Sequence, residues 1–225
     1  DMSIPYRVSN DFDTIAELQS GIWNHNNHYH KFLLRNIRDR CNDALEIGCG
    51  AGEFCTQLAQ KGARVIGIDS SAGMIRKAER VSSAPNISYV NMDACECSFE
   101  DESFDCIVSI ATMHHLPYEA TLRNMRRWLR RGGTILILDL YRSEAVVDHL
   151  CSLIALPMST VMSVAMNKRI GQAQEEARLW KEHSGYDRFM SIAEIDSYVD
   201  TILPGAKVER RLFWRYSLVW HKQEA

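Results

Sequence analysis

The feature that most constrains the fold of this chain is a run of alternating glycines near residue 50. The stretch ALEIGCGAGEF, residues 44–54, is a short apolar run followed by Glu46 and by glycines at 48, 50 and 52. Such a run predicts a buried strand that ends in a tight turn, and the residues from Glu53 onward predict a helix. Glycine permits backbone angles that other residues resist, and it lets a ligand approach the main chain closely. A strand, a glycine turn and a helix N-terminus form the usual nucleotide corner of an α/β sheet.

The hydrophobic pattern after this corner alternates between strands and helices. We expect strands at 44–47, 64–68, 87–91, 104–110 and 134–140, and helices at 53–61, 71–81 and 118–129. The last of these helices should end at the pair Gly132-Gly133. Strands that alternate with helices at this spacing predict a parallel, doubly wound sheet. Two later runs, 206–212 and 213–221, predict an antiparallel pair of strands at the sheet edge.

The regions that flank this core are predicted to be mostly helical. Residues 12–40 suggest two helices, separated by an aromatic and polar cluster at 23–30. Residues 143–186 begin with an apolar half, and residues 191–194 have the form of a capping box that begins another helix. We expect a single domain. Its parts are a helical lid at 1–41, the core at 42–141, a helical cap at 142–190, and the last helix and strands at 191–225.

Charge and cysteine content narrow the classes of partner. The net charge of −3 argues against a general nucleic-acid binder, which usually carries a basic face. The basic run RRWLRR at 126–131 is placed at a helix C-terminus, where cations suit the helix dipole. The seven cysteines are expected to be free thiols in a reducing compartment. The first thirty residues show no signal peptide, and the uncharged run 150–167 contains Pro157, so we expect a cytoplasmic protein without a membrane span.

No metal site is predicted. Cys95 and Cys97 are too close together in the sequence for an ordinary pair of zinc ligands, and the sequence has no second pair of ligands to complete such a site. The histidines at 25, 28 and 30 lack an adjacent cysteine or acid, so helix-capping or lid contacts are the simpler interpretation.

Glycine turns of this kind serve both nicotinamide dinucleotides and S-adenosylmethionine (SAM), and three details favour SAM. The dinucleotide fingerprint needs a third glycine at position 53, where Glu53 would repel a pyrophosphate. The carboxylate of Glu46, two residues before the first glycine, can approach the ammonium group of SAM. Further acids end or follow the next two strands, at Asp69 and Asp93.

These positions suit the parts of SAM at the carboxyl ends of the strands. A carboxylate at Asp69 can accept both hydrogen bonds of a ribose diol. Asp93 can accept from the exocyclic amine of adenine while the amide of Ala94 donates to the ring, and Ser70 and Met74 can flank the adenine. The full set of predicted cofactor-binding residues is Tyr29, Glu46, Gly48, Gly50, Asp69, Ser70, Met74, Asp93, Ala94 and Ile110.

The chain resembles the class I SAM-dependent methyltransferases, in particular the small-molecule enzymes of the ubiquinone/menaquinone type. ALEIGCGAGEF, VIGIDSSAGMI, VNMDA, FDCIVSIATMHHL and RRGGTILILDL occur in family order and spacing over residues 42–141, and residues 206–221 resemble the last two strands. The resemblance implies a doubly wound, Rossmann-like sheet of seven strands with helices on both faces, an N-terminal helical lid and a helical insert after strand five. It also implies SAM as cofactor, S-adenosylhomocysteine as product, and a small, partly apolar organic acceptor.

A general base helps methyl transfer when the acceptor is a hydroxyl, and histidines are the leading candidates. His114 and His115 follow the fourth strand at the methyl end of the cofactor, and His28 lies in the N-terminal cluster. Further candidates are Tyr29, His30 and Tyr141. The His-His-Leu-Pro sequence also occurs in family members without a known base, where it shapes the loop or touches substrate.

Two rival functions stay open. One is an RNA or protein methyltransferase, although Ala111-Thr112-Met113-His114 after strand four is not the Asn/Asp-Pro-Pro-aromatic motif that suits planar amines. The other is a SAM-binding module without catalysis. The acceptor, its reacting atom and the oligomeric state are left undetermined.

Overall fold

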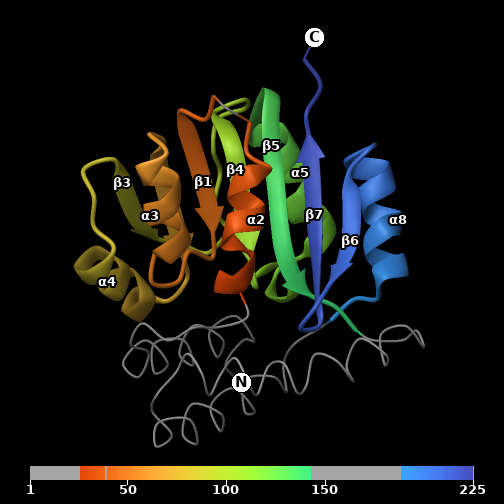
Figure 1. Cartoon of the computed structure of the whole chain (residues 1–225), viewed down its shortest axis with the longest axis horizontal. Coiled ribbons are helices and arrows are strands. Elements are labelled where there is room, and N and C mark those ends of the chain that lie inside the picture. The colour runs from red at the N-terminus through yellow and green to blue at the C-terminus, as the bar shows by residue number, and fades with distance from the viewer. Residues whose placement is uncertain (1–25, 39, 143–188, 225) are drawn as a thin grey trace, which may run out of the picture.

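Seven strands form one mixed sheet in the order β3-β2-β1-β4-β5-β7-β6 (Figure 1). The computed structural model describes residues 26–38, 40–142 and 189–224. The strands are β1 Asp43–Ile47, β2 Arg64–Asp69, β3 Ile87–Asn91, β4 Phe104–Ile110, β5 Leu129–Leu140, β6 Lys207–Arg211 and β7 Arg215–His221. The first five pair in parallel, and β7 pairs antiparallel with both β5 and β6. The predicted parallel sheet with an antiparallel edge is confirmed.

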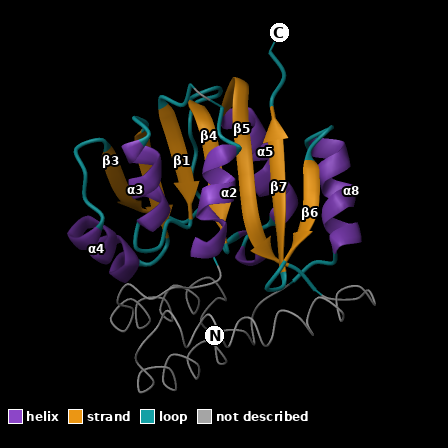
Figure 2. Cartoon of the chain, in the orientation of Figure 1, coloured by secondary structure: helices purple, strands orange, loops and turns teal. Residues whose placement is uncertain are grey.

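Helices cover both faces of this sheet (Figure 2). In Figure 1, α2 and α3 lie in front of the strands and α5 lies behind them. The helices are α2 His30–Arg35, α3 Glu53–Gln60, α4 Ala72–Val81, α5 Tyr118–Trp128 and α8 Ile192–Ile202, with short 3-10 turns η1 Asn27–Tyr29 and η2 Met113–His115. Because β1 lies between β2 and β4, the strand order reverses there, and ligands of open α/β sheets bind at such a reversal.

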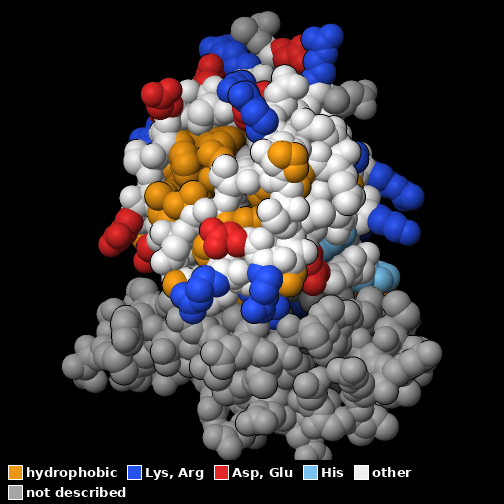
Figure 3. All heavy atoms as spheres, turned by 90° about the vertical axis from the view of Figure 1, so that its left-hand side faces the viewer, with side chains coloured by type: hydrophobic (Ala, Val, Ile, Leu, Met, Phe, Trp, Pro, Cys, Tyr) orange, Lys and Arg blue, Asp and Glu red, His pale blue; other side chains and the backbone are white. Residues whose placement is uncertain are grey.

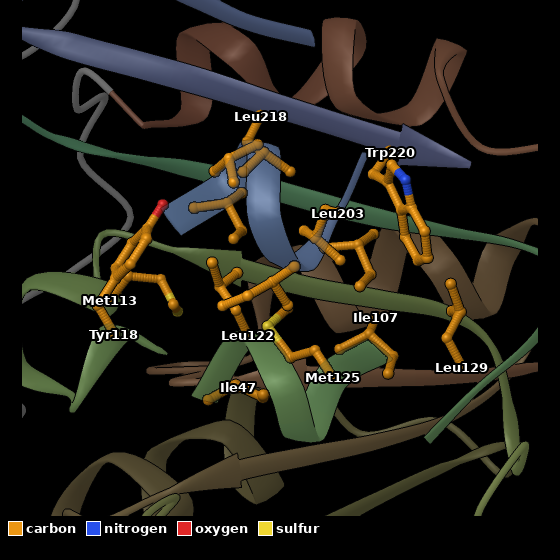
Figure 4. Close-up of a cluster of buried hydrophobic side chains, with 14 of the residues drawn as sticks. Ile47, Ile107, Met113, Tyr118, Leu122, Met125, Leu129, Leu203, Leu218 and Trp220 are labelled. Atoms are coloured by element: carbon orange, nitrogen blue, oxygen red, sulfur yellow. The ribbon is translucent and has the colours of Figure 1, made fainter. Parts of the chain in front are cut away.

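Alternate residues of each strand pack into opposite cores, as the two-residue period of a strand requires. On β1, Leu45 and Ile47 pack in the cluster that contains α5 and α8, whereas Ala44 packs in the cluster that contains α2 and α3. Figure 4 shows the first cluster, in which Leu122 and Met125 of α5 lie against side chains from the sheet. Both are fully buried, so truncating either one to alanine should cost about 2–5 kcal/mol.

Two helix N-termini have side-chain caps, and one of them was predicted from the sequence. Ser71 caps α4, because its hydroxyl accepts a hydrogen bond of 3.0 Å from the amide of Met74. Ser191 and Glu194 form a reciprocal capping box at the start of α8, which confirms the predicted box. These caps fix where α4 and α8 leave the edge of the sheet.

The predicted start of β5, at residue 134, was wrong, whereas the helix before it ends within one residue of its predicted end at 129. The helix α5 ends at Trp128, and β5 begins at Leu129, so Gly132 and Gly133 lie inside the strand. Leu129 has an extended backbone, is fully buried and pairs with Phe104. Arg130 then forms ion pairs with the carboxylates of Asp43 and Asp105, at 2.8 and 3.0 Å. The packing of Leu129 and these ion pairs hold residues 129–131 in the strand, ahead of the glycine pair.

The edge of the sheet at β3 differs from its centre. β3 is only partly buried, and hydrophobic side chains gather on this side of the molecule (Figure 3). The helix predicted at the start of residues 12–40 and nearly all of the helical cap at 142–190 lie outside the described residues, as do the aromatic and polar residues at 23–25.

Candidate functional site

The glycine turn after β1 leaves room for a ligand at one position. Gly48, Gly50 and Gly52 all have positive φ angles, of 73°, 51° and 77°. A β-carbon on Gly48 would lie 2.0 Å from Oγ1 of Thr112, and one on Gly52 would lie 2.2 Å from the hydroxyl oxygen of Tyr89. A β-carbon on Gly50 would meet no atom of the described residues within 4 Å. Gly48 and Gly52 are therefore needed for packing, while the main chain at Gly50 is open to an approaching cofactor.

Asp69, at the end of β2, braces this turn. Its Oδ2 accepts a hydrogen bond of 2.9 Å from the amide of Gly50, and its Oδ1 accepts one of 2.9 Å from the amide of Ser71. The side-chain amide of Asn91 donates to the backbone oxygens of Asp69 and Ser70. Each carboxylate oxygen can accept more than one hydrogen bond. Asp69 is thus placed both to hold the turn and to accept from a ribose diol.

Asp93 and Ala94 lie in the turn after β3, at the same edge of the sheet. The Oδ1 of Asp93 accepts a hydrogen bond of 2.8 Å from the amide of Cys95. The amide of Met92 donates to the backbone oxygen of Asp69 at 3.0 Å, which joins the ends of β2 and β3. Two of the three acids predicted to contact the cofactor, Asp69 and Asp93, therefore lie at neighbouring strand ends.

Glu46 and Met74 are deeply buried beside the turn, at 3% and 4% exposed. The thiol of Cys55 donates to Oε2 of Glu46 at 2.9 Å. Burial raises the pKa of Glu46 to about 8, so its carboxyl is mostly protonated at neutral pH. A contact between Glu46 and the ammonium group of SAM stays a prediction.

The chain leaves β4 through a strained turn. Ile110 is half-buried at the strand end, and Ala111 follows it with a φ of 51°. A left-handed backbone costs a residue other than glycine roughly 1–2 kcal/mol. The amide of Ala111 donates to the backbone oxygen of Leu138 at 2.8 Å, which holds the turn against β5. Such strain is often stored at functional sites, and this turn leads directly into η2.

The turn brings His114 to Asp139 on β5. The Nδ1 of His114 lies 2.7 Å from Oδ1 of Asp139, and the backbone amide of His114 donates to Oδ2 at 2.8 Å. The amide of Leu140 also donates to Oδ1, at 2.8 Å. The side chains are 7% and 2% exposed, respectively. The imidazole and the main chain of His114 are therefore both fixed by one buried carboxylate.

Aromatic residues surround this pair. The rings of His115 and Phe189 lie 3.9 and 5.2 Å from the ring of His114. The hydroxyl of Tyr216 donates to that of Tyr118 at 3.2 Å, and burial raises the pKa of both phenols. His114 and His115 thus lie together at the carboxyl edge, as the sequence indicates.

The N-terminal candidates pack against other parts of the chain. The hydroxyl of Tyr29 donates to the backbone oxygen of Leu212 at 3.1 Å, and the ring is buried. The ring of His28 is exposed and lies 5.7 Å from that of Phe213. Both residues therefore contact the connection between β6 and β7, and their predicted roles in cofactor binding and catalysis stay predictions.

His30 and Tyr141 are both buried, at 6% exposed. Nδ1 of His30 lies 2.8 Å from Nε2 of Gln57, and burial lowers the pKa of His30 to about 4. A histidine with this pKa is neutral at pH 7. Tyr141 follows β5, and its amide donates to the backbone oxygen of Trp214 at 3.3 Å. His30 is best described as a core residue of the contact between α2 and α3.

Sequence reasoning missed two buried charged residues at this edge, Asp139 and Arg215. Arg215 is 8% exposed and donates to Oδ1 of Asn26 and to the backbone oxygen of Phe213, both at 2.7 Å. Burial lowers the pKa of Arg215 to about 10, so it stays cationic at neutral pH. The available signal was the acid within the apolar run ILDL, since a buried carboxylate is costly unless it has partners.

The described ranges hold neither a metal-ion cluster nor a membrane-spanning helix. Within them, no three His, Cys, Asp or Glu side chains cluster in a way that could hold a metal ion. The helices placed in those ranges are also all too short or too polar to cross a membrane.

Comparison with known proteins gives matches of sequence and of fold. Residues 45–137 match a family model described as a methyltransferase domain. An uncharacterized methyltransferase of Mycobacterium tuberculosis is 27% identical over 205 residues, which cover 88% of this chain and 96% of that protein. The demethylmenaquinone methyltransferase of Staphylococcus aureus is 30% identical over 149 residues, covering 64% of this chain and 60% of that protein.

Among solved structures, the magnesium protoporphyrin IX methyltransferase of Synechocystis with bound SAM has the same fold. It superposes with a TM-score of 0.63 at 13% sequence identity, and the match covers 99% of each chain. The seven-stranded Rossmann-like fold that the sequence predicts is therefore confirmed.

Proposed function

Because the chain carries a methyltransferase domain of the SAM-dependent class, we propose that it transfers a methyl group to a small, partly apolar organic acceptor. SAM supplies a methyl group that is already activated on a sulfonium, so the main demand on the protein is an in-line approach of the nucleophile. The names of a relative and of a structural neighbour, with demethylmenaquinone and magnesium protoporphyrin IX as their molecules, support an acceptor of this kind.

The observation that carries this proposal is the contact between the glycine turn and the loop that holds His114. β1 and β4 are neighbours, and their last paired residues are Ile47 and Ser109. Thr112 packs so closely on Gly48 that no side chain would fit there. A cofactor held at Gly50 would therefore lie beside the loop that carries the candidate base.

The residues of the cofactor half would divide the work of binding. The open main chain at Gly50 would admit the cofactor, and Asp69 would accept from the ribose hydroxyls. Asp93 and Ala94 would contact the adenine. These roles are supported by the placement of all four residues at the ends of neighbouring strands.

In the acceptor half, His114 would act as the general base for an acceptor hydroxyl. It would take the hydroxyl proton while the acceptor oxygen attacks the methyl carbon. His115, whose ring lies against that of His114, would shape the site. His28 is exposed and its ring lies against that of Phe213 in the β6–β7 connection, so it is the weaker candidate.

Calorimetric titration with S-adenosylhomocysteine tests the cofactor site. Asp69→Ala should bind much more weakly, because each hydrogen bond to a charged group contributes about 1.5–3 kcal/mol. Asp101→Ala is the matched control, since Asp101 is exposed and pairs with Arg127 at the opposite edge. Equal affinity of native protein and Asp69→Ala would remove Asp69 from the site, and tight NADH binding by the native protein would contradict the whole proposal.

An assay with methyl-labelled SAM tests the class of acceptor. We expect label in a panel of small phenols, quinols and aliphatic alcohols, and none in total RNA or in protein. Label in RNA or protein would instead support a macromolecular acceptor. Tight cofactor binding without transfer to any class would indicate a binding module.

A further inference from the structure

Asp139 is a buried acid for which methyl transfer has no direct use. Its residue exposure is 1%, and it lies on β5 opposite Tyr216 of β7. Burying a carboxylate is costly unless hydrogen bonds compensate it. Three such bonds are present, and two of them come from the same residue, His114.

We propose that Asp139 is a positioning residue that holds His114 in the tautomer with the proton on Nδ1, an inference that rests on the proposed role of His114. The two carboxylate oxygens already accept from the backbone amides of His114 and Leu140. An ionised carboxylate is purely an acceptor, so the 2.7 Å contact with Nδ1 is a hydrogen bond donated by the ring.

The consequence concerns the other ring nitrogen. A neutral imidazole with its proton on Nδ1 has the lone pair on Nε2, so Nε2 becomes the basic atom. When Nε2 takes a proton from the acceptor hydroxyl, the imidazolium lies next to a negative charge that stabilises it. The proton would end on Nε2, and the electron pair of the broken O–H bond would form the new O–CH3 bond. The bond between the methyl carbon and the sulfonium would break at the same time, with its electron pair passing to the sulfur, which leaves as the thioether of S-adenosylhomocysteine.

Among the side chains described around Asp139, the imidazole of His114 is the one that bonds to its carboxylate. Arg215 also lies close enough to feel its charge, but its guanidinium donates to Asn26 and Phe213 instead. Tyr216 donates to Tyr118. The titratable groups described around the pair are His115, Tyr118, Arg215 and Tyr216.

Two backbone features help to place His114 over Asp139. They are the left-handed turn at Ala111 and the hydrogen bond from the amide of His114. The turn directs the chain from β4 toward β5, and the amide bond fixes the main chain of His114 over Asp139. The ring nitrogen can then reach Oδ1 of the same carboxylate. One side chain therefore sets both the position and the tautomer of the imidazole.

Nitrogen-15 NMR of the imidazole rings tests the proposal without any acceptor. The resonances of His114 are assigned by their loss in His114→Gln. In the native protein, we expect a protonated Nδ1 and an unprotonated Nε2 at pH values above the titration of the ring. In Asp139→Asn, the amide group can donate to Nδ1, so the proton should move to Nε2 and the apparent pKa of His114 should fall. Asp105→Asn, which alters a carboxylate at the opposite edge, should keep the native tautomer.

A native His114 with its proton on Nε2 would overturn the proposal, and so would an Asp139→Asn variant that keeps the native tautomer. If Asp139→Asn does not fold, the native spectrum alone decides. Turnover provides an independent readout. Asp139→Asn should approach the rate of His114→Ala near neutral pH with an unchanged KM for SAM, whereas equal losses at every pH would show a merely structural role. Failure to bind S-adenosylhomocysteine would contradict the proposed function and leave the tautomer result standing.

Discussion

The two halves of the sheet hold their polar residues in different ways. In the β1–β3 half, Asp69 bonds to Gly50, 19 residues away, and to Ser71, two residues away. In the β4–β7 half, the partners are 25 residues apart for His114 and Asp139, 98 for Tyr118 and Tyr216, and 189 for Asn26 and Arg215. The β1–β3 half, which is the proposed cofactor half, thus includes a bond within one turn, whereas the bonds named in the β4–β7 half, the proposed acceptor half, all join residues at least 25 positions apart.

In the proposed function, the β1–β3 half binds SAM and the β4–β7 half faces the acceptor. A turn that must admit a cofactor needs glycines and nearby acids, and these can be written into short motifs. A base must be oriented against an acceptor, and we propose that a buried carboxylate from a distant strand does this for His114. Changes in one half should therefore act on binding, and changes in the other on turnover.

The largest expected effect is in the acceptor half. His114→Ala should lower turnover roughly 10²–10⁴-fold, since that is the usual contribution of a general base. Its affinity for S-adenosylhomocysteine, measured by calorimetry, should stay close to native. His221→Ala is the control, because His221 lies at the other end of β7 beside Thr134. Near-native turnover in His114→Ala would place catalysis on proximity alone or on another residue.

A pH effect distinguishes the cofactor half. The pKa of Glu46 is raised from 4.5 to about 8, so between these values the unfolded state loses a proton that the folded state keeps. Glu46 should therefore make the protein less stable as pH rises from 5 to 8, by about 1.4 kcal/mol per pH unit at most. Glu46→Gln should lack this decline in chemical unfolding experiments.

The comparison of native protein with Glu46→Gln also cancels the opposite contribution of His30. The pKa of His30 is lowered to about 4, so that residue destabilises the fold as pH falls below 6.5. Parallel stability curves for native protein and Glu46→Gln would show that Glu46 is ionised in the folded state.

Two glycine-to-alanine variants, Gly48→Ala and Gly62→Ala, test the contact that joins the two halves. Gly48→Ala should lose about 1–2 kcal/mol to its left-handed backbone and a further 1–3 kcal/mol to the clash with Thr112. Gly62→Ala carries the backbone cost alone, because its β-carbon would meet nothing within 4 Å. Equal losses of stability in the two variants would mean that the loops of β1 and β4 are not tightly packed.

The fold was largely predictable from sequence, and so was the position of Gly50, Asp69 and Asp93 at neighbouring strand ends, whereas the bond between His114 and Asp139 was not. The glycine turn, Asp69 and Asp93 can be recognised in the sequence, because each stands at or just after the end of a predicted strand. The start of β5 was misplaced because Gly132-Gly133 resembles a helix stop, while the burial of Leu129 depends on its pairing with Phe104. Asp139 was missed because its partner His114 lies in another loop, which no periodicity connects to β5.

The smallest effect concerns the turn that leads to His114. Ala111→Gly should relieve a left-handed strain of roughly 1–2 kcal/mol and lose about 0.5–1 kcal/mol in backbone entropy, for a net gain between about zero and 1.5 kcal/mol. Ala111→Val should instead destabilise the fold. Thermal unfolding of both variants measures this. A loss of stability in Ala111→Gly would mean that relief of the left-handed backbone is outweighed, and the methyl group of Ala111 would be the next feature to test.

We propose that the two halves meet at the methyl group, a claim that a crystal structure with S-adenosylhomocysteine can test. We expect the ligand to lie over the main chain of Gly50, with its ribose at Asp69 and its sulfur facing the loop that carries His114. A ligand bound elsewhere, or one whose sulfur faces away from that loop, would contradict the claim.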